Sequence, residues 1–128
     1  MKQIEVVAAV FENEQGEYYC ARRKPGGELS MKWEFPGGKI ESGESQKQAL
    51  VREIKEELNL MIEINDFIMT VEHQYTSFHL TMHVYKVDIV EGRMILREHI
   101  DQKWLKREEL LSLDWAAADI PIVYKLME

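Results

Sequence analysis

Three closely spaced glutamates are the strongest candidates for chemistry in this sequence. Glu53, Glu56 and Glu57 are spaced i, i+3 and i+4, so a helix would carry them on one face. That face borders the predicted apolar stripe of Leu50 and Ile54, where carboxylates are partly buried and repel one another unless a positive charge lies among them. Clustered carboxylate oxygens suit Mg²⁺ or Mn²⁺, which take substrate phosphates as further ligands.

A solvated, salt-bridged helix face is the alternative interpretation of the same glutamates. Arg52 stands four residues before Glu56, which is the spacing of an ion pair on an exposed helix. The segment from Arg52 to Glu57 does not by itself distinguish such a face from a metal site. The residues on either side of it must be considered with it.

The helix that carries these glutamates has clear signals at both ends. Ser45 and Gln48 match a capping box, which starts a helix, and Asn59 falls where a left-handed residue is expected to close it. Ahead of the helix, Gly37 and Gly38 lack Cβ atoms and therefore allow the backbone to come close to the glutamates.

Apolar and alternating segments predict a β-sheet around this helix. Strands are expected over residues 4–11, 17–22, 33–35, 61–75, 78–90 and 102–106. The third should stop at 36–38, and the fourth should be interrupted near Asn65. Short helices are expected over 107–113 and 121–127, the latter with Pro121 in its first turn. This order predicts an α/β fold in which a mixed β-sheet lies between helices.

Length and charge limit the classes of protein to consider. The 128 residues are expected to form one domain, 1–128, because domains commonly hold roughly 100–150 residues. The net charge of −7 argues against a nucleic acid polymer as partner, because such proteins need a basic face. Neither a membrane-spanning apolar run nor a signal peptide is evident, so a cytoplasmic protein is expected. The single cysteine, Cys20, excludes an internal disulfide.

The glutamates belong to a longer pattern, which resembles the Nudix signature. The matching residues are Gly38, Glu44, Arg52, Glu53, Ile54, Glu56, Glu57 and Leu60. Asn59 replaces the glycine that the signature has near its end. The Trp-Glu-Phe-Pro-Gly-Gly-Lys approach and the Ala-Asp-Ile-Pro-Ile-Val ending are similar to MutT-type nucleoside triphosphate pyrophosphohydrolases, most of all to the branch called CTP pyrophosphohydrolase. The resemblance implies a Nudix-type α/β/α sandwich.

The resemblance also implies a metal site and residues that support it. The expected ligands of Mg²⁺, with Mn²⁺ as the alternative ion, are Glu53, Glu56, Glu57, the carbonyl of Gly37, and Glu98 from a later loop. For Glu98, an exposed loop acid is the other interpretation. Arg52 is expected to orient a signature glutamate by a charge-assisted hydrogen bond, and Glu44 to support the loop or to bind metal indirectly.

The implied reaction is attack of water on a phosphorus of a (deoxy)nucleoside triphosphate, which releases a nucleoside monophosphate and pyrophosphate. Either Glu53 or Glu98 would accept the proton of the water. Lys39 and Arg23 are the candidates to offset the charge of the triphosphate, and ordinary solvated surface positions are the alternative for both.

Asp119 matches the position at which MutT-type enzymes contact the base. An ionised aspartate only accepts hydrogen bonds, so it would favour a cytosine-type edge over 8-oxoguanine. Its alternative role is the N-cap of the last helix. Phe35 and Phe78 are candidates to stack on the base, and a place in the core is the alternative for Phe78.

Other functions fit the same pattern. A Nudix hydrolase of another nucleotide derivative, such as 8-oxo-dGTP, ADP-ribose or a dinucleoside polyphosphate, is the main alternative. A non-catalytic nucleotide-sensing domain commonly lacks signature carboxylates, whereas Glu53, Glu56 and Glu57 are all present. Either a monomer or a homodimer is compatible with the sequence.

Overall fold

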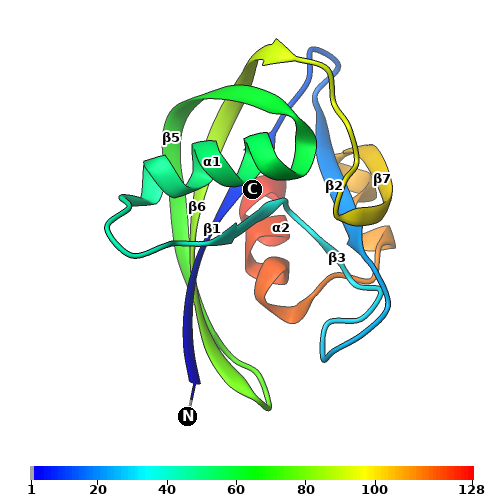
Figure 1. Cartoon of the computed structure of the whole chain (residues 1–128). Coiled ribbons are helices and arrows are strands. Elements are labelled where there is room, and N and C mark those ends of the chain that lie inside the picture. Colours follow the sequence, from blue (N-terminus) through cyan, green and yellow to red (C-terminus); the bar gives the residue numbers. More distant parts are fainter. Residues whose placement is uncertain (1) are drawn as a thin grey trace.

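The computed structural model describes residues 2–128. Its elements, in chain order, are β1 (Lys2–Phe11), β2 (Glu17–Arg23), β3 (Trp33–Glu34), β4 (Gly37–Lys39), α1 (Gln46–Leu58), β5 (Leu60–Gln74), β6 (Phe78–Gly92), β7 (His99–Lys106), the 3-10 helices η1 (Arg107–Ser112) and η2 (Ala117–Asp119), and α2 (Ile120–Met127). They can be followed in Figure 1. Within this described part, no helix combines the length and the apolar character needed to cross a membrane.

The strands form two sheets. The larger one has the order β4-β1-β6-β5, in which β1 and β6 run parallel and the other neighbours run antiparallel. The smaller one has the order β3-β2-β7 and is antiparallel. The prediction of an α/β fold with a mixed sheet is therefore confirmed. The second sheet was not predicted, because the strand segments alone do not show which strands pair.

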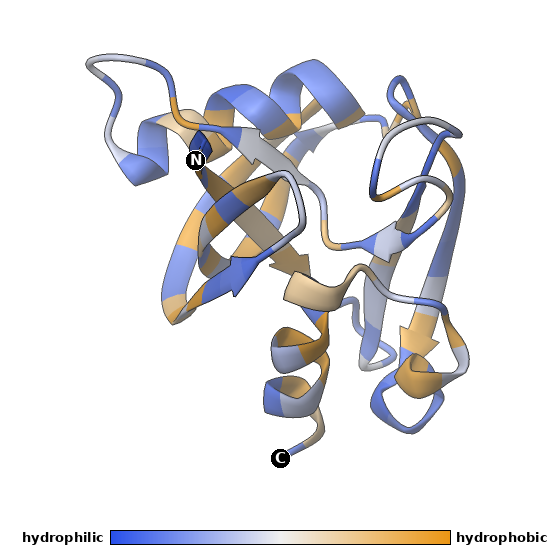
Figure 2. Cartoon of the chain, turned by 90° about the horizontal axis from the view of Figure 1, so that it is seen from below, coloured by the Kyte–Doolittle hydropathy of each residue, from blue (hydrophilic) through white to orange (hydrophobic). Residues whose placement is uncertain are grey.

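Two apolar clusters hold the helices against the strands. The cluster under α1 contains Val7, Ala9, Tyr19, Leu50, Ile54, Leu58 and Val87. The cluster under α2 contains Ala8, Val10, Cys20, Met82, Val84, Ile122 and Val123. Successive residues of β1 belong to different clusters, so the two helices cover opposite faces of that strand. In Figure 2, α2 carries both hydrophobic and hydrophilic residues, as expected for a helix with one buried side.

Helix α1 begins and ends as predicted. Ser45 Oγ accepts a hydrogen bond from the backbone N–H of Gln48 at 3.1 Å, and Gln48 Oε1 accepts one from the N–H of Ser45 at 2.9 Å. Asn59 closes the helix in the left-handed conformation, with φ 61° and ψ 34°. These caps fix which residues of α1 face the strands and which face the loops.

The prediction that residues 36–38 merely end a strand was wrong. The chain leaves the smaller sheet after β3 and enters the larger one as β4, where Gly37 pairs with Ala8. Only glycine permits this pairing, because a Cβ at Gly37 would lie 1.9 Å from the carbonyl oxygen of Val7. The sequence suggested a turn because a glycine pair follows a proline. The strand with which this segment pairs, β1, is distant in sequence, so no local pattern indicated the pairing.

Two further expectations need adjustment. Strand β5 continues past Asn65, and the predicted interruption appears as a register irregularity between Ile64 and Asp66. The helix expected over 107–113 is a 3-10 helix that ends at Ser112.

Substitution of the two adjacent glycines should affect stability unequally. Gly37→Ala places a methyl group against fixed backbone, so we expect the free energy of unfolding to fall by about 1–3 kcal/mol. Gly38→Ala would meet the end of the Glu53 side chain, which can rotate away, so its cost should be clearly smaller. Urea denaturation of both variants measures the difference. Equal losses would contradict the close backbone approach at Gly37.

Candidate active site

A cavity lined by carboxylates lies where the two sheets meet. Its volume is about 340 Å³, and it is lined by Arg23, Lys24, Pro25, Gly26, Glu34, Gly37, Glu57, Glu98 and His99. These residues come from the ends of β2, β3 and β7, from β4 and from α1. We call this space the carboxylate cavity. The structure therefore brings three residues predicted as metal ligands, Gly37, Glu57 and Glu98, to one place.

Glu57 is the buried acid of this cavity. Burial, followed by the negative charges of Glu53, Glu34 and Glu98, raises the pKa of Glu57 to about 9. Its Oε1 atom is buried and has no hydrogen-bond partner among residues 2–128. A buried carboxylate surrounded by other acids requires a proton or a cation in order to be stable.

Glu53 lies beneath the second glycine of β4. A Cβ at Gly38 would come within 2.3 Å of the Glu53 carboxyl group, so only a glycine leaves room for that side chain as it stands. The Glu53 side chain is only 15% exposed. Burial raises its pKa, and the hydrogen bond from Arg52 opposes that shift. Glu53 and Glu57 are close enough for each to change the pKa of the other.

Arg52 is the cation that holds this group of acids together. Its Nε and Nη2 donate to the two carboxylate oxygens of Glu44 at 2.7 and 2.9 Å, a bidentate pair. Its Nη1 donates to Glu53 at 2.9 Å, and its Nη2 also reaches the carbonyl oxygen of Lys39 at 3.0 Å. The Arg52 contact and the backbone N–H of Glu41 lower the pKa of Glu44 to about 2. The guanidinium thus fixes Glu53 between α1 and the loop that precedes it.

Glu56 is placed differently from the other signature acids. Its side chain is 60% exposed and accepts a hydrogen bond from Arg52 at 3.2 Å. Like Glu44 and Glu53, it is absent from the lining of the carboxylate cavity, to which only Glu57 of the signature acids belongs. Across residues 2–128, the Asp, Glu, His and Cys side chains form no group of three already gathered to hold a metal ion. The donors suit a divalent cation chemically, and side-chain rotations would be needed to assemble them around one.

The loop that carries Glu98 is anchored on the last turn of α1. The backbone N–H of Arg97 donates to the carbonyl of Glu57 at 3.2 Å, and Arg97 Nη1 donates to the carbonyl of Glu56 at 3.2 Å. Asn59 Nδ2 donates to the carbonyl of Arg93 at 3.1 Å. A glycine at position 59 would lack this last contact. The helix end therefore positions Glu98 beside Glu57.

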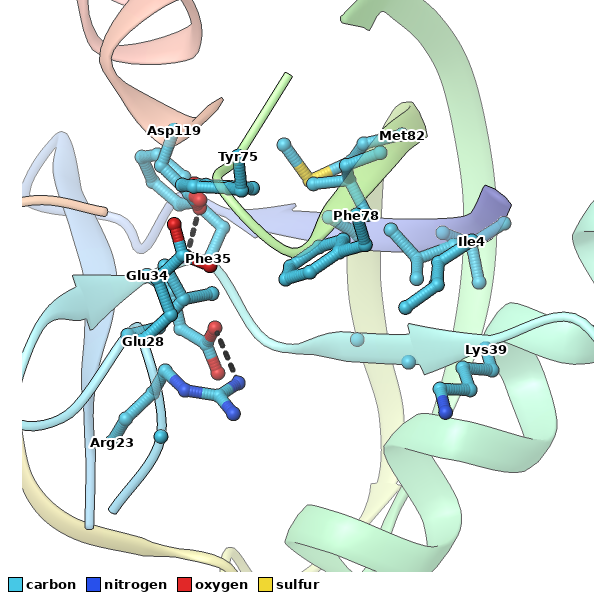
Figure 3. Close-up of a pocket in the computed structure, with 18 of the residues that line it drawn as sticks. Ile4, Arg23, Glu28, Glu34, Phe35, Lys39, Tyr75, Phe78, Met82 and Asp119 are labelled. Carbon is cyan, nitrogen blue, oxygen red and sulfur yellow. Dashed lines mark hydrogen bonds and ion pairs between the residues drawn. The ribbon is translucent and has the colours of Figure 1, made fainter. Parts of the chain in front are cut away.

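A larger cavity adjoins the first and contains the residues predicted to bind substrate. Its volume is about 430 Å³, and its lining includes Arg23, Phe35, Lys39, Phe78 and Asp119. We call it the aromatic cavity (Figure 3). Both cavities share Arg23, Gly26, Glu34 and Gly37 in their linings, so they lie side by side.

Asp119 points into the aromatic cavity and does not cap α2. It occupies the N-cap position, but its side chain makes no capping hydrogen bond, so the capping alternative was wrong. Its Oδ2 instead accepts a hydrogen bond from the backbone N–H of Phe35 at 2.9 Å. Burial and the charge of Glu34 hold the pKa of Asp119 well above its usual range. The surroundings of Asp119 thus favour its neutral form over the ionised acceptor expected from the sequence.

The two phenylalanines differ in their freedom to contact a ligand. Phe35 is 3% exposed, and its ring stacks on Trp115 with the centroids 4.8 Å apart. Phe78 is half-buried and lies 5.0 Å from the ring of Tyr75. Both phenylalanines line the aromatic cavity, while Phe35 also belongs to the core cluster under α2 and Phe78 packs against that cluster, so the alternative of a place in the core holds beside the cavity position.

Sequence reasoning missed several cavity residues. Glu34 and His99 line the carboxylate cavity, and Glu28 and Tyr75 line the aromatic one. Glu28 joins two loops by accepting hydrogen bonds from the backbone N–H groups of Thr76 and Ser77. Glu34 could have been noticed within the Trp-Glu-Phe-Pro-Gly-Gly segment. For Glu28, Tyr75 and His99, no local signal distinguishes them from other loop and strand residues.

The stability of the metal-free chain should fall as the pH rises. The pKa of Glu57 increases from 4.5 to about 9 on folding, so the folded chain holds a proton that the unfolded chain releases between these values. The free energy of unfolding should therefore decrease across this window, by at most about 1.4 kcal/mol per pH unit from this group. Urea denaturation in EDTA at pH 5, 7 and 9 measures the slope.

Glu57→Gln should make this slope clearly shallower, with the raised pKa values of Glu53 and Asp119 accounting for what remains, while the exposed Glu63→Gln should retain the full slope. At pH 8, added Mg²⁺ should raise the melting temperature of the wild-type chain and raise that of Glu57→Gln much less. An identical response of both variants to pH and to Mg²⁺ would contradict the role assigned to Glu57.

Comparisons with known proteins agree with this geometry. A family model described as NUDIX domain matches residues 7–125. A CTP pyrophosphohydrolase of Escherichia coli is 36% identical over 127 residues, which cover 99% of this chain and 93% of that protein. An 8-oxo-dGTP diphosphatase of the same organism is 31% identical and covers 98% of each chain. The solution structure of the E. coli ORF135 protein has a TM-score of 0.86 at 37% identity, with 99% of this chain and 90% of that one covered. The chain belongs to the NUDIX domain family.

Proposed function

We propose that this chain is a magnesium-dependent hydrolase that converts nucleoside triphosphates to nucleoside monophosphate and pyrophosphate. The observation that carries this proposal is that the two cavities lie side by side and share Arg23, Glu34 and Gly37 in their linings. One cavity is aromatic and apolar with a single buried carboxyl group, which suits a base. The other is lined by carboxylates, which suit the metal that accompanies phosphates.

The proposed metal ligands are Glu53, Glu57, Glu98 and the carbonyl of Gly37, with Glu56 joining them if it leaves Arg52. The raised pKa of Glu57 and its unpartnered Oε1 support a cation at this point. When bound, Mg²⁺ would neutralise phosphate oxygens and make water a better nucleophile at neutral pH.

Either Glu53 or Glu98 would take the proton from the attacking water, and their surroundings differ. Glu53 is held by Arg52 at 2.9 Å, so its orientation is fixed, and burial raises its pKa although the Arg52 hydrogen bond opposes that shift. Glu98 is exposed and lies on the anchored loop, so it can turn toward water or substrate. Arg23 and Lys39 line the aromatic cavity and supply the positive charge that a triphosphate requires.

The base would contact Asp119 inside the aromatic cavity. Oδ2 is occupied by the N–H of Phe35, which leaves Oδ1 for the ligand. An ionised Oδ1 accepts from an amino group such as that of cytosine, whereas a neutral carboxyl group can also donate to a ring nitrogen or a carbonyl oxygen. We propose cytosine-type nucleotides as the first substrates to test and 8-oxo-dGTP as the second, since the relatives bear both names.

A product analysis tests the chemistry. Wild-type chain with Mg²⁺ should convert CTP, dCTP or 5-hydroxy-dCTP to the monophosphate and pyrophosphate. Glu53→Gln and Glu98→Gln, assayed in parallel, should each lower kcat, and the residue that acts as general base should show the larger loss, about 10²–10⁴-fold. Release of inorganic phosphate instead of pyrophosphate would contradict the proposed reaction. Hydrolysis of ADP-ribose alone would assign the chain to a different substrate class.

Asp119→Asn tests how the base is read. The amide of Asn keeps the shape of the carboxyl group, and its oxygen can still accept from the N–H of Phe35. Its NH₂ group would then present a donor to the base, and the side chain carries no charge. If Asp119 is read as an ionised acceptor, the ratio of kcat/KM for dCTP over 8-oxo-dGTP should fall about tenfold in the variant. An unchanged ratio would show that Asp119 does not select the base by its charge.

A further inference from the structure

Glu34 connects two basic residues at the junction of the cavities. Its Oε1 accepts a hydrogen bond from Nη1 of Arg23 at 3.2 Å, and its Oε2 lies 2.8 Å from Nε2 of His99. Each carboxylate oxygen thus has its own partner. Figure 3 shows Arg23 beside Glu34 at the edge of the aromatic cavity.

The smaller sheet assembles these three residues. Strands β2 and β7 pair so that Arg23 lies opposite His99, directly after a register irregularity that follows Arg22. Glu34 is on β3, the neighbour of β2 on its other side. The three side chains therefore come from three adjacent strands and meet at the end of the paired region.

The hydrogen bond between His99 and Glu34 is protected from water. The His99 side chain is 4% exposed and the Glu34 side chain 17%. A carboxylate paired with Arg23 has no proton to give, so the Nε2–H of His99 is the donor. The Arg23 side chain, in contrast, is 43% exposed. A buried histidine thus fixes, through Glu34, an arginine that is otherwise free to move in solvent.

We propose that His99 is a positioning residue that, through Glu34, holds the Arg23 guanidinium at the point where the aromatic cavity meets the carboxylate cavity. This inference rests on the proposed function, because it assumes that a nucleotide spans both cavities. Arg23 would then contact the ligand between its base and its outer phosphates.

His99 lies in the lining of the carboxylate cavity, and its polar contact is with Glu34. Its second ring nitrogen, Nδ1, is buried and has no hydrogen-bond partner among residues 2–128. A buried nitrogen presents no surface to a nucleotide, so the Nε2 contact is the one through which His99 affects the site.

The benefit of this arrangement is an arginine that is ordered before the ligand binds. A free arginine loses side-chain entropy when it is immobilised on a ligand, and preorganisation removes that cost. The effect belongs to binding of the ligand, so it should appear in KM and not in kcat.

Two substitutions at His99 separate positioning from packing. His99→Phe keeps a planar ring but removes the donor, and His99→Gln keeps an N–H near the place of Nε2. We expect His99→Phe to raise KM for the preferred nucleotide about tenfold with kcat within about twofold of wild type, because one charge-assisted hydrogen bond is lost. His99→Gln should remain within about threefold of the wild-type KM, since the donor is retained.

His83→Phe is a matched control. His83 also faces a carboxylate, with its Nε2 2.7 Å from Glu5 Oε2, but it lines neither cavity, so its loss should leave KM unchanged. An equal rise in KM for His99→Phe and His99→Gln would show that only packing matters. A fall in kcat at unchanged KM, or no effect of His99→Phe, would also overturn the proposal.

A second measurement does not depend on turnover. NMR of the guanidinium group measures rotation about the Nε–Cζ bond of Arg23, and Arg23→Lys identifies its signal. This rotation should be slow in the wild type and in His99→Gln. It should become fast in His99→Phe. If the wild type hydrolyses no nucleotide, the proposed function fails, whereas rotation that is equally fast in all three chains refutes the role of His99.

Discussion

The backbone of residues 36–39 passes from one sheet to the other, so close to neighbouring atoms that only glycine fits at positions 37 and 38 unless a neighbouring group moves. Gly37 lies against the carbonyl of Val7, and Gly38 lies over the carboxyl group of Glu53. This close passage brings the short strand β3, which carries Glu34, next to the helix that carries the acids. Both cavities have Gly37 in their lining, so both depend on this close passage of the backbone beside Val7 and Glu53.

Negative charge is concentrated at this point, and few cations oppose it. Glu53, Glu34 and Glu98 surround Glu57, and their charges add to the effect of burial on its pKa. Arg52 is committed to Glu44 and Glu53 and does not line the carboxylate cavity. An additional positive charge is the simplest way to relieve the remaining repulsion. The fold thus stores an electrostatic cost that binding of a cation would remove.

The sequence predicted what local patterns encode. The capping box at Ser45, the left-handed Asn59 and the shared face of the glutamates follow from spacing along one helix, and the structure confirms the caps. The pairing of β4 with β1 and the approach of His99 to Arg23 depend on strands distant in sequence, which no local pattern specifies. The raised pKa of Asp119 could not be predicted for a related reason, because its burial arises from elements that only the fold brings together.

The anchoring of the Glu98 loop on the last turn of α1 links the position of Glu98 to the hydrogen bonding of the helix end. Ile95 donates to the carbonyl of Leu58, and Arg97 donates to that of Glu57, so the loop completes the hydrogen bonding of the helix end. Leu58 is fully buried in the cluster under α1, so the helix end that supports the loop is itself held by the core. The position of the Glu98 carboxylate is therefore coupled to the packing of α1 on the strands. A substitution that loosened this packing would displace Glu98 from Glu57 without touching either residue.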